Sequence, residues 1–194
     1  MTSQAPDGVL FDGDEFAVTA IDGTGLFDPV AHGLEPRAFS TGCYRGYVCE
    51  YAVVEQRLVL RELELGSTDE PARLAGVQPE RDRDGWSSGW SWHYRGLDIP
   101  VAFTGRLLIG RGDIPNRPYL HMGFWPAWMY WEVHELTLRT GMLLSAVDCS
   151  AAVAATRADI IETAARPAPG ESTEDWIRRT FSLTYDYSWP GRRD

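Results

Sequence analysis

Lysine is absent from this chain of 194 residues, and all 18 of its basic residues are arginine. Without a lysine amine the chain cannot form a lysine Schiff base or use lysine as a nucleophile, which excludes these routes of catalysis. Basic residues are also in the minority, because 28 acidic residues bring the formal net charge to −10. This charge repels nucleic-acid phosphates and anionic lipid headgroups, so we expect neither nucleic acid nor a membrane as a partner. It favours a cationic partner instead.

Cysteine is scarce, and the three that occur are Cys43, Cys49 and Cys149. An odd number of cysteines is not typical of a disulfide framework. Residues 1–13 lack the basic start and the apolar run of a secretory signal, and no apolar stretch approaches the roughly 20 residues of a membrane span. Together these absences predict a cytoplasmic protein with reduced thiols.

Sequence signatures of metal binding and of phosphate binding are missing as well. Cys-x-x-Cys does not occur, and His134-Glu135 is not followed by a second histidine at helical spacing. The segment Gly110-Arg-Gly-Asp113 is predicted to be a turn, because it is not a glycine-rich stretch that leads into a helix and so does not fit a phosphate-binding loop. We therefore expect no metal and no cofactor. The sequence leaves open whether the chain is an enzyme.

Strand-like segments dominate the chain, since apolar and polar residues alternate in most of them. Two hairpins are expected, one where residues 38–54 and 57–65 meet at Glu55-Gln56 and one at Arg139-Thr-Gly141. The other expected strands are 16–21, 101–109, 119–124, 129–138, 142–147 and 181–189. These segments predict a mainly β fold, either an antiparallel barrel or a strongly curved sheet of about nine strands.

One or two helices are expected to cover this sheet near the C-terminus. The alanine-rich run 151–165 follows the capping candidates Asp148 and Ser150, and Pro167 ends it. A short helical turn is expected from Thr173.

A chain of this length is expected to form one domain. We predict a flexible N-terminal lead-in at residues 1–13 and a single β-rich domain at 14–194. Within that domain, residues 66–85 are polar and punctuated by proline and glycine, which predicts an exposed excursion.

Tryptophan is concentrated in the middle of the chain, with six of the eight tryptophans between positions 86 and 131. Such a cluster has three interpretations: a dense core, the wall of an apolar pocket, or an exposed patch that anchors a protein partner. The pocket interpretation would use four side chains, Trp90, Trp92, Trp128 and Trp131.

Polar residues near these tryptophans are the remaining candidates for a binding site. Arg45 is expected on a strand among aromatic rings and thiols, where a guanidinium needs a carboxylate or a ligand anion as its partner; Glu132 is one candidate. A strand would place Glu132 and His134 on one face, about 7 Å apart, as a metal site could use. Histidines satisfied within an aromatic core, His121 among them, are the simpler expectation.

Several segments, taken together, resemble an uncharacterised family of β-rich bacterial proteins. The motifs that carry the resemblance are LFDPVAHGLEP at 26–36, STGCYRGY at 40–47, FTGRLLIGRG at 103–112, YLHMGF at 119–124 and VHEL at 133–136. The resemblance covers roughly residues 26–148 and places Arg45, His121 and His134 in recurring motifs. It implies no activity and no catalytic residues.

The sequence favours a non-enzymatic binding protein in the cytoplasm, whose acidic surface engages a protein partner in the manner of an immunity or adaptor protein. The alternative is a barrel that binds an apolar small molecule and acts as a cofactor-free cyclase or isomerase. In that case the tryptophans would shape the substrate, and Arg45, Glu132 or His121 would supply polarity or transfer a proton.

Overall fold

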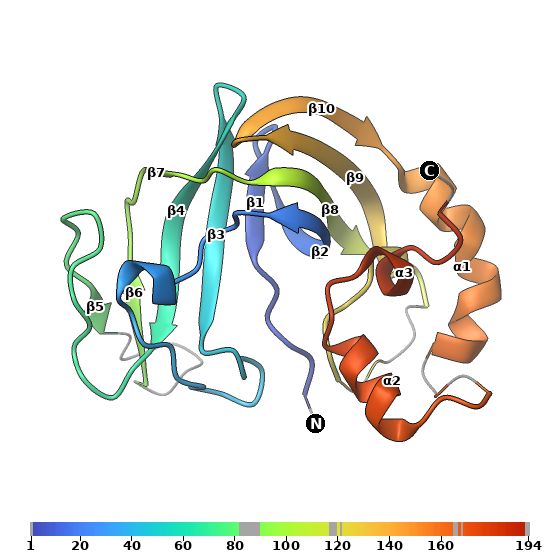
Figure 1. The fold of residues 1–194 in the computed structure, drawn as a ribbon. Helices are drawn as coiled ribbons and strands as arrows, with labels where there is room; N and C mark the ends of the chain where they lie inside the picture. The colour runs from blue at the N-terminus through green and yellow to red at the C-terminus, as the bar shows by residue number, and fades with distance from the viewer. Residues whose placement is uncertain are drawn as a thin grey trace.

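The computed structural model describes residues 2–81, 90–116, 120, 122–164, 167 and 169–192. The fold is mainly β, as predicted, with a group of helices at the C-terminal end (Figure 1). The strands are β1 (Gly8–Phe11), β2 (Asp14–Thr24), β3 (Tyr47–Val54), β4 (Arg57–Gly66), β5 (Glu80–Arg81), β6 (Ser91–Tyr94), β7 (Ile99–Pro100), β8 (Thr104–Asp113), β9 (Tyr130–Arg139) and β10 (Met142–Asp148). The helices are α1 (Ser150–Ala164), α2 (Thr173–Thr180) and α3 (Tyr185–Ser188), with short 3-10 turns η1 (Val30–His32) and η2 (Ala127–Met129).

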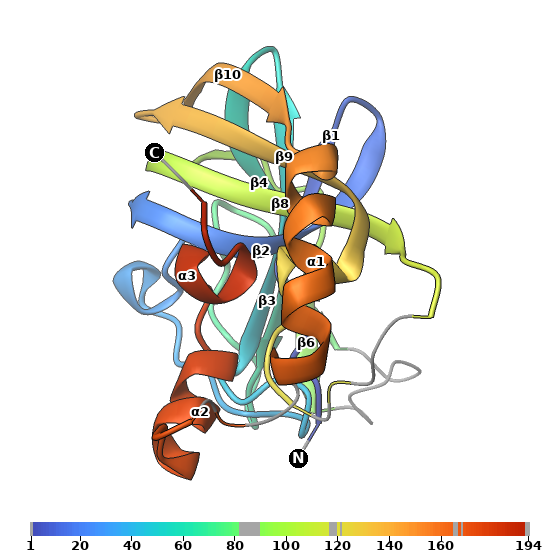
Figure 2. The ribbon, with the colours of Figure 1, turned by 90° about the vertical axis from the view of Figure 1, so that its right-hand side faces the viewer.

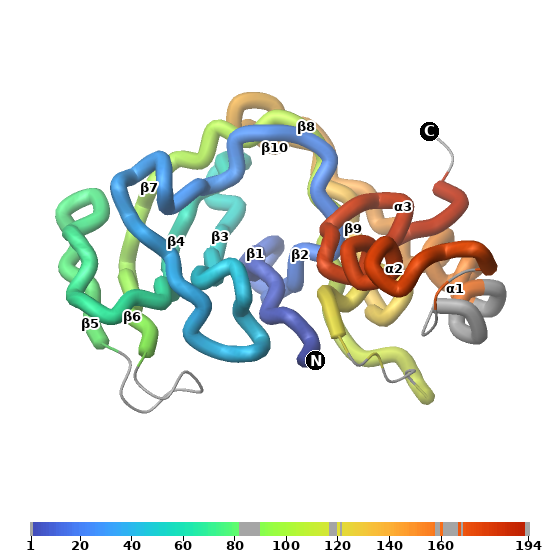
Figure 3. The backbone as a smooth tube through the Cα atoms, turned by 60° about the horizontal axis from the view of Figure 1, so that its bottom comes forward, coloured from blue at the N-terminus to red at the C-terminus, as the bar shows by residue number. Residues whose placement is uncertain are grey.

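The strands belong to one sheet that curves back on itself. Its order is β10-β9-β8-β2-β1-β3-β4-β6-β5, with β7 beside β4. β10 also meets β4 at the residue pair Met142–Arg57, so the first seven strands of this order form a closed ring (Figure 3). Within the ring β1 runs parallel to β3. The pair β2–β8 and the pair β8–β9 are both antiparallel.

Both predicted hairpins are present, and their turns lie side by side where the ring closes. Glu55 and Gln56 have φ of 48° and 62°, and Thr140 and Gly141 have φ of 47° and 79°. Left-handed backbone at both central residues is what a two-residue hairpin of type I′ requires. The Leu143 N–H donates to the Gln56 carbonyl over 2.8 Å, and the Leu58 N–H donates to the Gly141 carbonyl over 2.8 Å.

Apolar clusters lie on both faces of the sheet. Alternate residues of the ring strands, such as Val18, Leu63 and Leu136, are buried in one cluster inside the ring. Their neighbours on the other face, such as Leu108 and Val133, pack with η2 and α1 on the outside of β8 and β9 (Figure 2).

The helices begin close to where the sequence predicts them. The Asp148 carboxylate accepts from the Ser150 N–H over 2.9 Å at the start of α1, and Ser172 caps α2. Among the described residues, no helix combines the length and the apolar character needed to cross a membrane.

The N-terminal segment differs from the predicted lead-in, because Gly8–Phe11 forms β1 within the sheet. Val9 is buried and lies opposite Phe16 of β2 and Tyr51 of β3. A strand of four residues is too short for its alternation to stand out in the sequence.

The strand predicted at 181–189 is wrong, because Tyr185–Ser188 forms α3. Tyr185 and Trp189 both pack against the cluster on the outer face of the sheet. Residues four apart lie on one side of a helix as well as on one side of a strand, so a short alternating pattern does not separate the two.

Two further strand predictions are wrong. Residues 120 and 122–124, the described part of the segment 119–124, lie outside regular strands; Gly123 forms only an isolated bridge with Ser3. Residues 38–46 lie outside the regular strands, with an isolated bridge between Ser40 and Cys43 and a left-handed φ of 81° at Gly46, so β3 begins only at Tyr47. In the segment 66–85, most residues up to Arg81 are exposed, and 82–85 lie outside the described residues.

Candidate functional site

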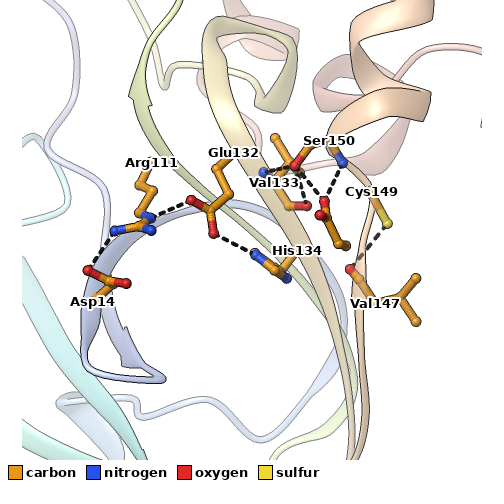
Figure 4. A network of polar contacts seen from close by, with 9 residues as sticks. Asp14, Arg111, Glu132, Val133, His134, Val147, Cys149 and Ser150 are labelled. Atoms are coloured by element: carbon orange, nitrogen blue, oxygen red, sulfur yellow. Dashed lines mark hydrogen bonds and ion pairs between the residues drawn. The ribbon is translucent and has the colours of Figure 1, made fainter.

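A line of four charged or titratable side chains crosses β2, β8 and β9 (Figure 4). Arg111 joins Asp14 and Glu132, with Nη1 of Arg111 2.6 Å from Asp14 Oδ1 and its Nε donating to Glu132 Oε2 over 2.7 Å. On the other oxygen of the same carboxylate, Oε1 lies 2.9 Å from His134 Nε2. One carboxylate therefore holds both an arginine and a histidine.

Strand register explains why these groups meet. Arg111 of β8 lies opposite Glu132 of β9, and His134 follows two residues later on the same face of β9. The imidazole of His134 packs against Phe16 and Phe11, with ring centroids 5.4 and 5.8 Å away. Aromatic contacts and the hydrogen bond to Glu132 thus fix the orientation of the histidine.

The carboxylates of this region are held in their ionised form. Hydrogen bonds from His134 and then Arg111 lower the pKa of Glu132. Hydrogen bonds from the side chain and the main chain of Ser150 lower the pKa of Asp148, at the end of β10. Both groups therefore carry negative charge at neutral pH.

A surface pocket of about 430 Å³ lies between the start of β9 and the first turns of α1. Its lining residues are Trp131, Glu132, Asp148, Ser150, Ala151, Ala154 and Arg157. Trp131 is 63% exposed, so its indole offers an open aromatic surface in a pocket that Asp148 and Glu132 also line. Because Trp131 and Glu132 are consecutive on β9, their side chains leave the strand on opposite faces, and the Glu132 carboxylate is turned to Arg111 and His134. On the α1 side the pocket is lined by the small side chains of Ala151 and Ala154.

Ser150 and Arg157 hold the walls of the pocket together. The Ser150 hydroxyl accepts from the Val133 N–H over 3.0 Å, which fixes the start of α1 to β9. Arg157 of α1 donates from Nε to the Trp128 carbonyl over 2.9 Å and from Nη2 to the Tyr130 carbonyl over 3.0 Å. The guanidinium is thereby bound to the main chain of η2 and of the first residue of β9. An open aromatic face, the ionised carboxylate of Asp148 and small neighbours suit a cationic group such as a guanidinium or an ammonium.

Two of the predicted site residues, Trp131 and Glu132, line the pocket, and a third, His134, lies 2.9 Å from the Glu132 carboxylate. Arg45 lies elsewhere, in the turn before β3, and its partner is Asp7. The expected pairing of Arg45 with Glu132 is therefore wrong. The physical reason is that β1 pairs with β3, which brings the segment just before β1 next to Arg45.

The other predicted tryptophans do not line one common pocket. Trp128 is fully buried among the residues between the sheet and α1. Trp92 is buried too, and its indole N–H donates to the Ser67 carbonyl over 3.2 Å. Trp90 is 56% exposed and lies just before β6, on the β4 side of the sheet. His121 lies outside the described residues.

The sequence interpretation missed Asp14, Arg111, Asp148 and Arg157 as members of the site. Arg111 was hidden because the segment 110–113 reads as a turn, whereas β8 continues through Asp113. Asp148 was predicted only as a helix cap. The usable signal is pairwise: an arginine and a glutamate on two neighbouring antiparallel strands, each near the same end of the sheet.

Comparison with known proteins identifies no matching family model, no curated protein of significant similarity and no solved structure of significant similarity. Within the part of the chain that the structure describes, no three histidine, cysteine, aspartate or glutamate side chains converge as a set of metal ligands would. The function is therefore argued from the site alone.

Proposed function

We propose that this chain is a non-enzymatic binding domain of the cytoplasm, immunity- or adaptor-like, whose pocket beside Trp131 receives a basic side chain of a protein partner. The observation that carries the proposal is the exposed indole of Trp131 in a pocket that the ionised residues Asp148 and Glu132 also line. The free thiols of all three cysteines are compatible with a reducing compartment.

The physical basis is that an arginine or lysine can use all parts of this pocket at once. Its charged head would hydrogen-bond to carboxylate oxygens while its planar or aliphatic part covers the indole of Trp131. Tryptophan is among the residues that most often dominate the binding energy of protein interfaces. The net charge of −10 would add to this by accelerating the encounter with a basic partner.

The test is capture of a partner from cell lysate by the wild-type chain and by three variants. Trp131→Ala and Asp148→Asn should each lose the captured partner, with a loss of affinity of about 30-fold for the tryptophan, or roughly 2 kcal/mol. Trp90→Ala is the matched control, because it removes another exposed indole from a different part of the sheet. Equal capture by the wild-type chain and by Trp131→Ala would contradict the proposal. Capture of acidic and basic proteins to the same extent would contradict it as well.

A second candidate function is favoured by one observation, the hydrogen bond between His134 and Glu132. A carboxylate that fixes an imidazole is a common arrangement for proton transfer, so a barrel that isomerises or cyclises an apolar small molecule without a cofactor stays a proposal. Its test is the indole N–H spectrum of the protein during titration with a panel of apolar ligands. Saturable shifts that need His134, as judged with His134→Ala, would support this candidate, and an unchanged spectrum would remove it.

A further inference from the structure

Strand β10 has one edge that lacks a partner strand over most of its length among the described residues. β10 pairs with β9 along its length, but its pairing with β4 is limited to Met142. The last main-chain bond on that side runs from the Leu143 N–H to the Gln56 carbonyl, at the tip of the hairpin formed by β3 and β4. From Leu144 to Asp148, no described residue pairs with this edge (Figures 1 and 2).

The register identifies the main-chain groups on the free edge. The Cys149 N–H donates to the Val133 carbonyl over 2.8 Å. In an antiparallel pair, bonded and non-bonded residue pairs alternate, so Val147 and Ser145 also point their main-chain groups at β9. Ala146 and Asp148 therefore present their N–H and C=O groups outward.

The composition of this edge is unlike that of a protected one. Edge strands usually carry lysine, proline or inward-pointing charges that discourage pairing with another chain. The segment Leu144-Ser-Ala-Val147 has none of these, and Leu144 and Val147 are 53% and 52% exposed. Only the irregular register between Leu143 and Ser145 interrupts the strand.

We infer that an extended, arginine- or lysine-rich segment of the partner protein adds to β10 as a further strand. The inference rests on the proposed function, since the free edge ends at Asp148, which also lines the pocket beside Trp131. Outward N–H and C=O groups would bind the main chain of that segment, and one basic side chain would occupy the pocket. Charge selects this occupant over a second copy of the chain, because two copies of net charge −10 repel each other.

The experiment uses a short capped peptide in which arginine and valine alternate, together with a twin that carries N-methyl groups on alternate residues. Binding of both peptides is measured by calorimetry to the wild-type chain, Ala146→Pro and Ala146→Ser. Proline removes the outward N–H of residue 146 and is tolerated on edge strands, whereas serine keeps that N–H. We expect N-methylation and Ala146→Pro each to weaken binding by about tenfold or more, and Ala146→Ser to leave it unchanged.

A second measurement keeps the test independent of folding defects. Amide exchange in the wild-type chain should show new protection at Ala146 and Asp148 when the unmodified peptide is added, with Ser145 and Val147 already protected by β9. Failure of the peptide to bind, or binding without this protection, would overturn strand addition. Sedimentation that shows a wild-type dimer lost in Ala146→Pro would also overturn it, because the occupant would then be a second copy.

The same variants separate this inference from the proposed function. If Trp131→Ala abolishes peptide binding but Ala146→Pro does not, the pocket stands and strand addition is wrong. If Ala146→Pro abolishes binding and Trp131→Ala does not, strand addition stands and the role of the pocket is wrong.

Discussion

Asp7 and Arg45 form a two-point ion pair, in which Arg45 Nη1 donates to Asp7 Oδ2 over 3.0 Å while Nη2 donates to Oδ1. The same Oδ1 accepts from the Cys49 N–H over 2.7 Å. The Asp7 side chain is only 5% exposed, so its charge depends on these partners. The pair ties the N-terminal segment to the start of β3.

Replacing Asp7 with alanine should therefore destabilise the fold strongly. The change leaves the Arg45 guanidinium largely buried and removes its carboxylate, which costs about 3 kcal/mol when a buried pair is broken on one side. Urea unfolding followed by tryptophan fluorescence measures this loss. Asp12→Ala, at an exposed aspartate of the turn between β1 and β2, is the control and should change stability by no more than about 0.5 kcal/mol.

Glu50 should make the stability depend on pH near neutrality. Glu50 is one of the exposed residues of β3, but partial desolvation of its carboxylate, followed by the charges of Asp7 and Glu15, raises its pKa to about 7. The folded state then holds a proton that the unfolded chain releases near its ordinary pKa of 4.5. Stability from this group is present below pH 4.5 and is lost as the pH rises through 7.

The matched variant for this prediction is Glu50→Gln, which cannot ionise. Urea midpoints of the wild-type chain should fall between pH 5 and 8 relative to those of Glu50→Gln, and the variant should be the more stable of the two at pH 8. Parallel curves for the two proteins over this range would show that the folded pKa is not raised.

Substitution of Trp128 should lower the stability of the fold much more than substitution of Trp131, although the two residues are only three positions apart. Trp128 is fully buried, so Trp128→Ala should cost about 3–5 kcal/mol of unfolding free energy through the lost packing and the cavity left behind. Trp131→Ala should change stability by no more than about 0.5 kcal/mol, because the indole is mostly exposed. Thermal unfolding of both variants measures this. A large loss of stability in Trp131→Ala would mean that this ring belongs to the core.

Gln56→Gly should stabilise the chain. Gln56 adopts a left-handed φ of 62°, which costs a non-glycine residue energy and costs glycine very little. We expect a gain of roughly 0.5–1 kcal/mol, since the Gln56 carbonyl that closes the ring is kept. Urea unfolding measures the gain. Gln56→Val is the opposite control and should destabilise, because a β-branched side chain fits this conformation poorly.

Local patterns predicted the parts of the structure that depend on neighbours in sequence. The two hairpins, the alanine-rich helix α1 and the shared face of Glu132 and His134 are of this kind. Pairing between distant strands could not be read in the same way. Asp7 meets Arg45 only because β1 lies between β2 and β3 in the sheet. The sequence around either residue does not predict this strand order.

The sequence could not predict which tryptophans are exposed either. Trp128 lies in the 3-10 turn η2 beneath α1, whereas Trp131 follows on β9 with its ring facing outward. A change from turn to strand within three residues reverses the direction of a side chain, so composition alone leaves core and interface equally plausible.

The ring closes at Met142 and Arg57, where its two end strands share only one residue pair. One residue pair and two adjacent main-chain bonds join β10 to β4, whereas β8 and β9 share eight residue pairs. Separation of β10 from β4 would break few hydrogen bonds and leave the other strand pairs of the ring intact. We therefore expect a detergent, a protease or a guest molecule to reach the apolar interior more easily here than between β8 and β9.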